Sequence, residues 1–209
     1  MNEQEHLATI ATLKAKMHEY HATIGRLMLK WAATETLLYN VLLNYGKLSD
    51  AVGRALLSGA RAKLLMDYLL AVAENTGLAD SCIDDLKCVF AQLTAINTMR
   101  DRIVHNGLWA FGSVDGNYAQ TITNMQRASR GEANMFMVQI DAVGIDAMVS
   151  DLSTIGQHLS RHLQQQFVPY RGKADACTWL YKPPQPILKR AQSHRSDRKQ
   201  YNQPGSSQA

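Results

Sequence analysis

The sequence predicts a mainly α-helical fold with a small antiparallel β insertion. Apolar residues recur every three or four positions over residues 3–105 and again after residue 142, as in amphipathic helices. The chain of 209 residues contains only five prolines, and none interrupts the first 168 residues. Between about residues 108 and 140, β-branched and aromatic residues with an Asp-Gly turn signal replace the helical pattern.

Residues 3–45 are expected to form one long helix or two helices in tandem, with Gly25 as the single weak point. The apolar positions that predict it are Leu7, Ile10, Leu13, Met17, Tyr20, Ile24, Leu27, Trp31, Leu38, Val41 and Tyr45. At 1.5 Å per residue, a helix of this length spans roughly 60 Å, which exceeds a small domain. Part of it is therefore expected to pack against a second subunit or to project from the body.

Three shorter helices are expected to follow. Ser49 or Asp50 caps the first, over residues 51–57, because both side chains can accept a hydrogen bond from a free helical N–H. The second covers residues 60–74, and its inward positions are Leu64, Leu65, Tyr68 and Leu69. The third runs from Asp80 or Ser81 to Asn106, where Asn-Gly is a signal for a helix end.

Strands are expected at residues 108–112, 119–125 and 134–140, and a last helix at 142–166. These elements make up a helical domain over residues 1–168, with the β insertion at about 108–140. Residues 169–209 form an extended tail with eight Lys/Arg and two Asp/Glu, in which Trp179 and Tyr181 are expected to strap onto the body. The tail is either a disordered, solvated end or a salt-sensitive contact for a phosphate backbone.

The composition excludes several classes of protein. No apolar run approaches the roughly 18 residues of a membrane span, and the polar, acidic residues 1–6 do not resemble a secretory signal. Cys82, Cys88 and Cys177 are odd in number and form no CxxC pair, so we expect no disulfide framework, no cysteine-ligated zinc and a cytoplasmic location. The chain lacks a P-loop, a dinucleotide fingerprint and a Gly-x-Ser-x-Gly elbow, so no cofactor is expected.

Residues 100–107 contain the charged and titratable side chains on which the functional prediction mainly rests. Asp101 and His105 stand four residues apart, so the carboxylate can orient the imidazole. Arg100 lies about 140° from His105 around the helix, but its side chain is long. If two copies meet, these groups can cleave RNA without a metal, with histidine moving a proton and arginine stabilising the phosphorane. Alternatively, Asp101 and His105 form a surface ion pair favoured by the helix dipole, and Arg102 is a solvated neighbour.

The pattern Arg100-Asp101-Arg102-Ile103-Val104-His105 resembles the signature of the HEPN superfamily. That signature has an arginine, a polar residue beside it, and a histidine separated from the arginine by four to six residues. The surroundings are also similar to the family, because a long first helix with Trp31 and Glu35 precedes a short helical pair and the motif helix. The resemblance covers roughly residues 20–168.

The resemblance implies a HEPN-like helical bundle and a metal-independent endoribonuclease. Such proteins are commonly homodimers in toxin–antitoxin, phage-defence and related systems, so RNA, a second copy and an antitoxin or defence partner are the expected partners. Arg100 and His105 would be catalytic, Asp101 supporting, and Glu35 a weaker candidate in the same cleft. The alternative is a catalytically inactive binding or regulatory module of the same fold.

Two features depart from the family pattern. Gly107 stands where the subgroup neutralised by a nucleotidyltransferase antitoxin carries tyrosine, so that form of regulation is not inferred. The β insertion is also larger than a minimal bundle needs.

Other residues have alternative interpretations. His158 and His162 have the i, i+4 spacing of metal ligands, but no cysteine is near and Asp151 lies two turns earlier. A solvated helix face is therefore favoured over a metal site. Trp31, Trp109 and Trp179 can stack on bases, although core or interface packing is the more common role of tryptophan.

Overall fold

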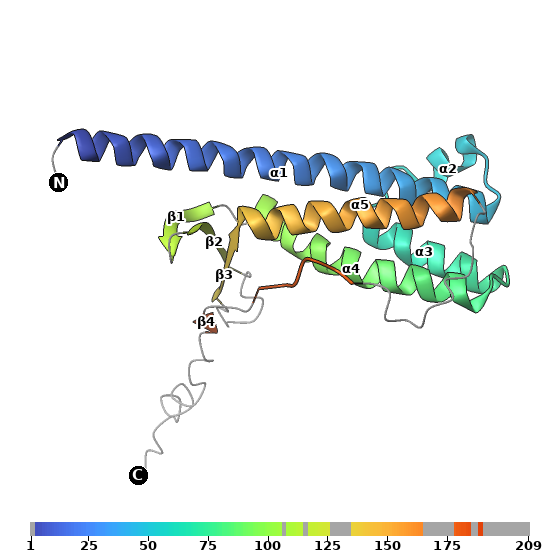
Figure 1. The fold of residues 1–209 in the computed structure, drawn as a ribbon. Coiled ribbons are helices and arrows are strands. Elements are labelled where there is room, and N and C mark those ends of the chain that lie inside the picture. Colours follow the sequence, from blue (N-terminus) through green and yellow to red (C-terminus); the bar gives the residue numbers. More distant parts are fainter. Residues whose placement is uncertain are drawn as a thin grey trace, which may run out of the picture.

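The computed structural model describes residues 3–105, 108–114, 117–125, 135–164, 178–184 and 188–189, with side chains for all of these except 108–125, 135–137 and 188–189. The fold is mainly α-helical, as the sequence predicts (Figure 1). The turn at Asp115-Gly116, Asn106, Gly107, Cys177, the Trp109 side chain and most of the basic tail lie outside this description.

Helix α1 (Glu3–Gly46) is one continuous helix, without a break at Gly25. Helix α5 (Ala142–Gln164) packs along it, and the apolar stripe of α1 is buried from Tyr20 onward (Figure 1). Tyr20 donates a hydrogen bond to the Ile140 carbonyl at the level where α5 begins. Residues 3–19, which we call the N-terminal arm, extend beyond α5, and Leu7 and Met17 stay exposed there. The predicted projection of this helix from the body is therefore confirmed.

Helices α2 (Asp50–Leu57), α3 (Ala62–Asn75) and α4 (Asp80–His105) complete the bundle. Ser49 caps α2 by accepting a hydrogen bond from the Val52 N–H, which confirms one of the two predicted caps. Leu65 and Leu69 of α3 are buried as expected. Leu64 and Tyr68 are exposed, so the prediction that they face inward is wrong: the buried stripe of α3 is narrower than its run of apolar residues.

Strands β1 (Leu108–Val114), β2 (Asn117–Met125), β3 (Met135–Asp141) and β4 (Leu188–Lys189) pair antiparallel in that order. The register between β1 and β2 shifts between Leu108 and Ala110. The strands lie at the end of the bundle from which α1 projects (Figure 1). Strand β4 belongs to the region that the sequence assigned to the tail, so part of that region pairs with the body.

Residues 178–184, which we call the strap, cross α4 and α5 and are held by a buried carboxylate. Asp151 of α5 accepts the backbone N–H groups of Leu180 and Tyr181, each at 2.9 Å. Gln92 of α4 donates to Asp151 at 2.7 Å and to the Tyr181 carbonyl at 3.1 Å. Asp151 and Tyr181 are both 2% exposed. The expected strapping through Tyr181 is confirmed, and Asp151 is the anchor that the sequence did not reveal.

Cys82 is a free thiol, whereas Cys88 takes part in a disulfide. The sequence predicted no disulfide framework, and the bond at Cys88 departs from that expectation, because an odd number of cysteines still allows one pair. Among the described helices, none combines the length and the hydropathy that crossing a bilayer requires.

Asp151→Ala should destabilise the fold by about 3 kcal/mol, because the N–H groups of Leu180 and Tyr181 and the Gln92 amide each lose the carboxylate that accepts from them. Asp146→Ala on the same helix is the matched control: its carboxylate pairs with Arg26 at 3.0 Å, both side chains are about half exposed, and such pairs contribute about 0–1 kcal/mol. Urea unfolding measures both. An equal loss in the two variants would contradict the anchoring role of Asp151.

Candidate functional site

Arg100 occupies a fixed position between α4 and α1. Its guanidinium carbon lies 4.7 Å from the centroid of the Trp31 ring, a cation–π distance, and its side chain is 15% exposed. The Arg100 Nε and Trp31 Nε1 atoms are buried, and neither has a hydrogen-bond partner within the described residues. Trp31 thus packs in the core against the motif arginine, in agreement with the packing interpretation of this tryptophan.

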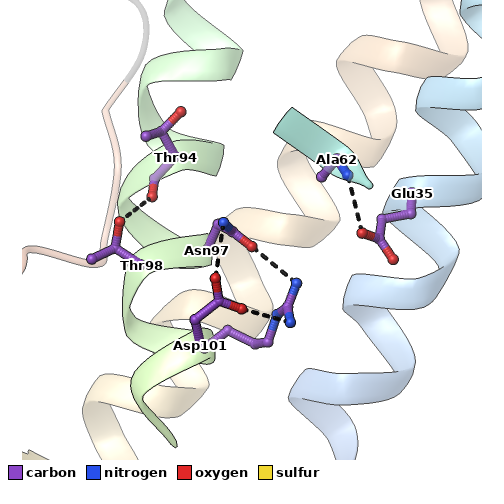
Figure 2. A network of polar contacts seen from close by, with 7 residues as sticks. Glu35, Ala62, Thr94, Asn97, Thr98 and Asp101 are labelled. Carbon is purple, nitrogen blue, oxygen red and sulfur yellow. Dashed lines mark hydrogen bonds and ion pairs between the residues drawn. The ribbon is translucent and has the colours of Figure 1, made fainter. Parts of the chain in front are cut away.

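The terminal amino groups of Arg100 are held by its helical neighbours. Nη2 donates to Asn97 Oδ1 at 2.9 Å, and Nη1 lies 2.7 Å from Asp101 Oδ1. Asn97 also donates to Asp101 at 3.4 Å, which links the three residues; Figure 2 shows Asn97 and Asp101 facing each other on α4. Asn97 was not predicted, although its position three residues before Arg100 is a signal that helix geometry supplies.

The predicted contact between Asp101 and His105 does not form. His105 is exposed at the last residue of α4, and no partner for it lies within the described part of the chain. The Asp101 carboxylate is taken by a full positive charge on Arg100, which attracts it more strongly than an imidazole does. The structure therefore corrects the orienting role of Asp101: it positions Arg100, not His105.

The two catalytic candidates lie on different sides of α4 within one chain. At 100° per residue, Arg100 and His105 are about 140° apart, whereas Arg102 and His105 are about 60° apart. Arg100 is turned toward Trp31 and α1, and His105 is turned to solvent. Arg102 is half-buried and not a solvated neighbour, which corrects the sequence-based expectation. A single copy therefore does not bring Arg100 and His105 onto one surface.

Glu35 has a structural contact. Its Oε1 atom accepts the backbone N–H of Ala62, the first residue of α3, at 3.2 Å (Figure 2). Arg61, at the N-cap position, makes no side-chain capping bond, so Glu35 supplies from α1 the acceptor that this helix end lacks. A carboxylate at a helix N-terminus is also favoured by the helix dipole.

A second polar cluster lies at the opposite end of the bundle. Asp85 of α4 binds two histidines of α5, with Oδ1 2.8 Å from His158 Nδ1 and Oδ2 2.9 Å from His162 Nε2. Although burial acts to raise it, these hydrogen bonds hold the pKa of the Asp85 carboxyl well below its usual range. The His162 side chain is fully buried and His158 is 15% exposed. The interpretation of this pair as a solvated face is therefore wrong.

Tyr45 extends the cluster to α1 through a hydrogen bond between its hydroxyl and His162 Nδ1. With Asp85 ionised, both imidazoles can donate to it, which leaves Nδ1 of a neutral His162 to accept from the phenol. Burial raises the pKa of Tyr45 to about 12, so the phenol stays protonated and able to donate. The chain Tyr45–His162–Asp85–His158 ties three helices together.

The described residues contain no group of three or more His, Cys, Asp or Glu side chains arranged to hold a metal ion. Asp85 was missed from the sequence, and its signal was a carboxylate one position before the buried Leu86 in the apolar stripe of α4. Compared with known proteins, the chain matches no family model, no curated protein and no solved structure.

Asp85→Asn should cost about 1–3 kcal/mol of stability at neutral pH, because an amide cannot accept from both histidines. The difference in stability between Asp85→Asn and the wild type should decrease as the pH falls. The folded-state pKa of Asp85 is depressed, so its stabilisation is complete above the unfolded value of about 3.9 and is lost as pH falls toward the folded value. Urea midpoints of the two proteins between neutral pH and pH 3 measure this. A difference between the two urea midpoints that increases below pH 4 would contradict this role of Asp85.

Proposed function

We propose that this chain is a metal-independent endoribonuclease with a HEPN-like helical bundle and β insertion, and that its active site is completed by a second copy. The observation that carries the proposal is how the structure arranges the two motif residues Arg100 and His105. Arg100 is immobilised by Trp31, Asn97 and Asp101, while His105 stands exposed at the end of the same helix. A fixed cation and a free imidazole on one helix are the two groups that RNA cleavage needs.

In the proposed mechanism His105 moves the proton. Acting as a base, it takes the proton of the ribose 2′-hydroxyl; as an acid, it gives one to the leaving 5′-oxygen. Arg100 stabilises the negative charge that develops on the phosphorane, and preorganisation by Asn97 and Asp101 reduces the reorganisation that this step requires. Because these groups diverge within one chain, we assign Arg100 to one copy and His105 to the other.

The N-terminal arm supports the proposed homodimer. Its apolar stripe continues the stripe that α5 covers farther along α1, and on the arm Leu7 and Met17 are exposed while Ile10 and Leu13 are half-buried. The arm and the motif end of α4 lie at the same end of the bundle (Figure 1). A second copy supplies the same apolar surface, so pairing of two arms satisfies both, as closed symmetric dimers do.

One observation favours the second candidate, an inactive binding or regulatory module. Arg100 is largely buried, and both of its terminal amino groups already contact Asn97 and Asp101. In such a module the arginine would hold α1 to α4 and would not meet a phosphate. An antitoxin or other defence partner is compatible with either candidate function. The inactive module would act only through a regulatory binding surface.

The nuclease proposal predicts that purified protein cuts single-stranded RNA in the presence of EDTA. His105→Ala should slow cleavage by about 10²–10⁴-fold, and Arg100→Ala by about 10²–10³-fold. His21→Ala, which removes an exposed histidine on α1, is the control and should cut normally. Circular dichroism must show that each variant is folded. Intact RNA with all four proteins would favour the inactive module, and equal cutting by His105→Ala and the wild type would contradict the proposed role of His105.

The dimer proposal predicts that the double substitution Leu13→Glu with Met17→Glu yields a monomer, because it places charge in the apolar stripe of the arm. Ala11→Glu with Ala15→Glu adds the same charge to the opposite, exposed face of the helix and should leave the dimer intact. Sedimentation equilibrium distinguishes the two. A wild-type protein that is monomeric at micromolar concentration would contradict the proposal.

A further inference from the structure

A hollow of about 330 Å³ lies between the strap and α4, beside the motif. Its walls come from α4 through Ala95, Thr98, Met99 and Arg102, and from the strap through Tyr181, Pro183 and Pro184. The hollow lies at the lower end of the range of small-molecule sites, which is roughly 300–1,000 Å³. Nothing in the roles assigned to Arg100 and His105 uses it.

Two residues with polar groups, Arg102 and Tyr181, line the hollow. The Tyr181 hydroxyl is buried and has no hydrogen-bond partner within the described residues, although a buried phenol normally has one. Burial raises the pKa of Tyr181 to about 12, and the positive charge of Arg102 opposes that shift, so the guanidinium lies within electrostatic reach of the phenol. The phenol is therefore a neutral donor beside a cation.

The register of α4 connects the hollow to the motif. Thr98, Arg102 and His105 stand at i, i+4 and i+7, so they follow one another along a single side of the helix. Arg100 lies on the side that faces Trp31. An RNA chain that passes His105 along this side of α4 would therefore reach Arg102 and then the hollow.

We infer that the hollow is a nucleotide subsite of the proposed nuclease, in which Arg102 holds a phosphate and Tyr181 binds the edge of the neighbouring base. The side chains of Met99, Pro183 and Pro184 provide apolar walls for a flat ring, and Arg102 provides the charge that a phosphate oxygen needs. The inference rests on the proposed function, because it takes RNA as the substrate. It also gives the strap a role, since Asp151 fixes the backbone N–H groups of Leu180 and Tyr181.

Binding, measured apart from cleavage, tests the subsite. The probe is a fluorescent 2′-O-methyl oligonucleotide, which lacks the 2′-hydroxyl nucleophile and stays intact. Arg102→Gln should weaken its binding by about tenfold, and Tyr181→Phe, which removes only the hydroxyl, by about threefold to tenfold. Arg54→Gln and Tyr68→Phe change an exposed arginine and an exposed tyrosine elsewhere and should bind as the wild type does.

The outcomes separate the two proposals. Tight binding that falls in Arg102→Gln and Tyr181→Phe supports the subsite even if no RNA is cut, in which case only the nuclease proposal fails. Equal loss in Arg102→Gln and Arg54→Gln, with Tyr181→Phe unchanged, shows general charge attraction and overturns the subsite. Adenosine and uridine 5′-monophosphate form a further arm. Competition by either at millimolar concentration supports a site for one nucleotide, and competition that survives Arg102→Gln overturns it.

Discussion

The apolar stripe of α1 is the constraint on which the rest of this structure depends. A single helix of 44 residues, about 66 Å long, cannot bury its stripe alone, so α5 must lie along it from Tyr20 onward. Three polar contacts between elements also start from α1. Trp31 holds Arg100, Glu35 caps α3, and Tyr45 reaches His162. On the N-terminal arm, where α5 has not yet begun, Leu7 and Met17 of the same stripe are exposed.

Two carboxylates, the buried Asp151 and the largely buried Asp85, join segments that lie far apart in the sequence. Asp85 receives two histidines of α5, and Asp151 receives two backbone N–H groups of the strap and the amide of Gln92. A buried carboxylate is costly unless its oxygens are hydrogen-bonded, so each site admits few alternative arrangements. The strap is therefore a specified element of the fold, and it runs directly beside the motif helix.

The residues of the motif are divided between two sides of α4. One side faces α1 and immobilises Arg100, and the other carries His105, Arg102 and the hollow beneath Tyr181. Within one chain, the guanidinium of Arg100 and the imidazole of His105 therefore lie on different sides of α4. The proposed nuclease therefore depends on the proposed dimer, because within one chain the contacts of Arg100 with Trp31 and Asn97 hold it on the side of α4 away from His105.

The sequence by itself determined the mainly helical fold, the order of the helices, a cap at Ser49 or Asp50 and the residues of the motif, because helical periodicity and capping are local properties. Only the tertiary structure decided which partner each polar group takes. Asp101 could have met His105 at i+4, yet Arg100 offers a full charge. His158 and His162 had the spacing of a solvated pair, but Asp85 comes from a helix more than 70 residues earlier. Asp151 and Tyr181 likewise meet across a chain separation of 30 residues, for which no local pattern exists. The local sequence determines on which face of its helix a side chain lies. The packing of segments distant in the sequence determines which residues contact that face.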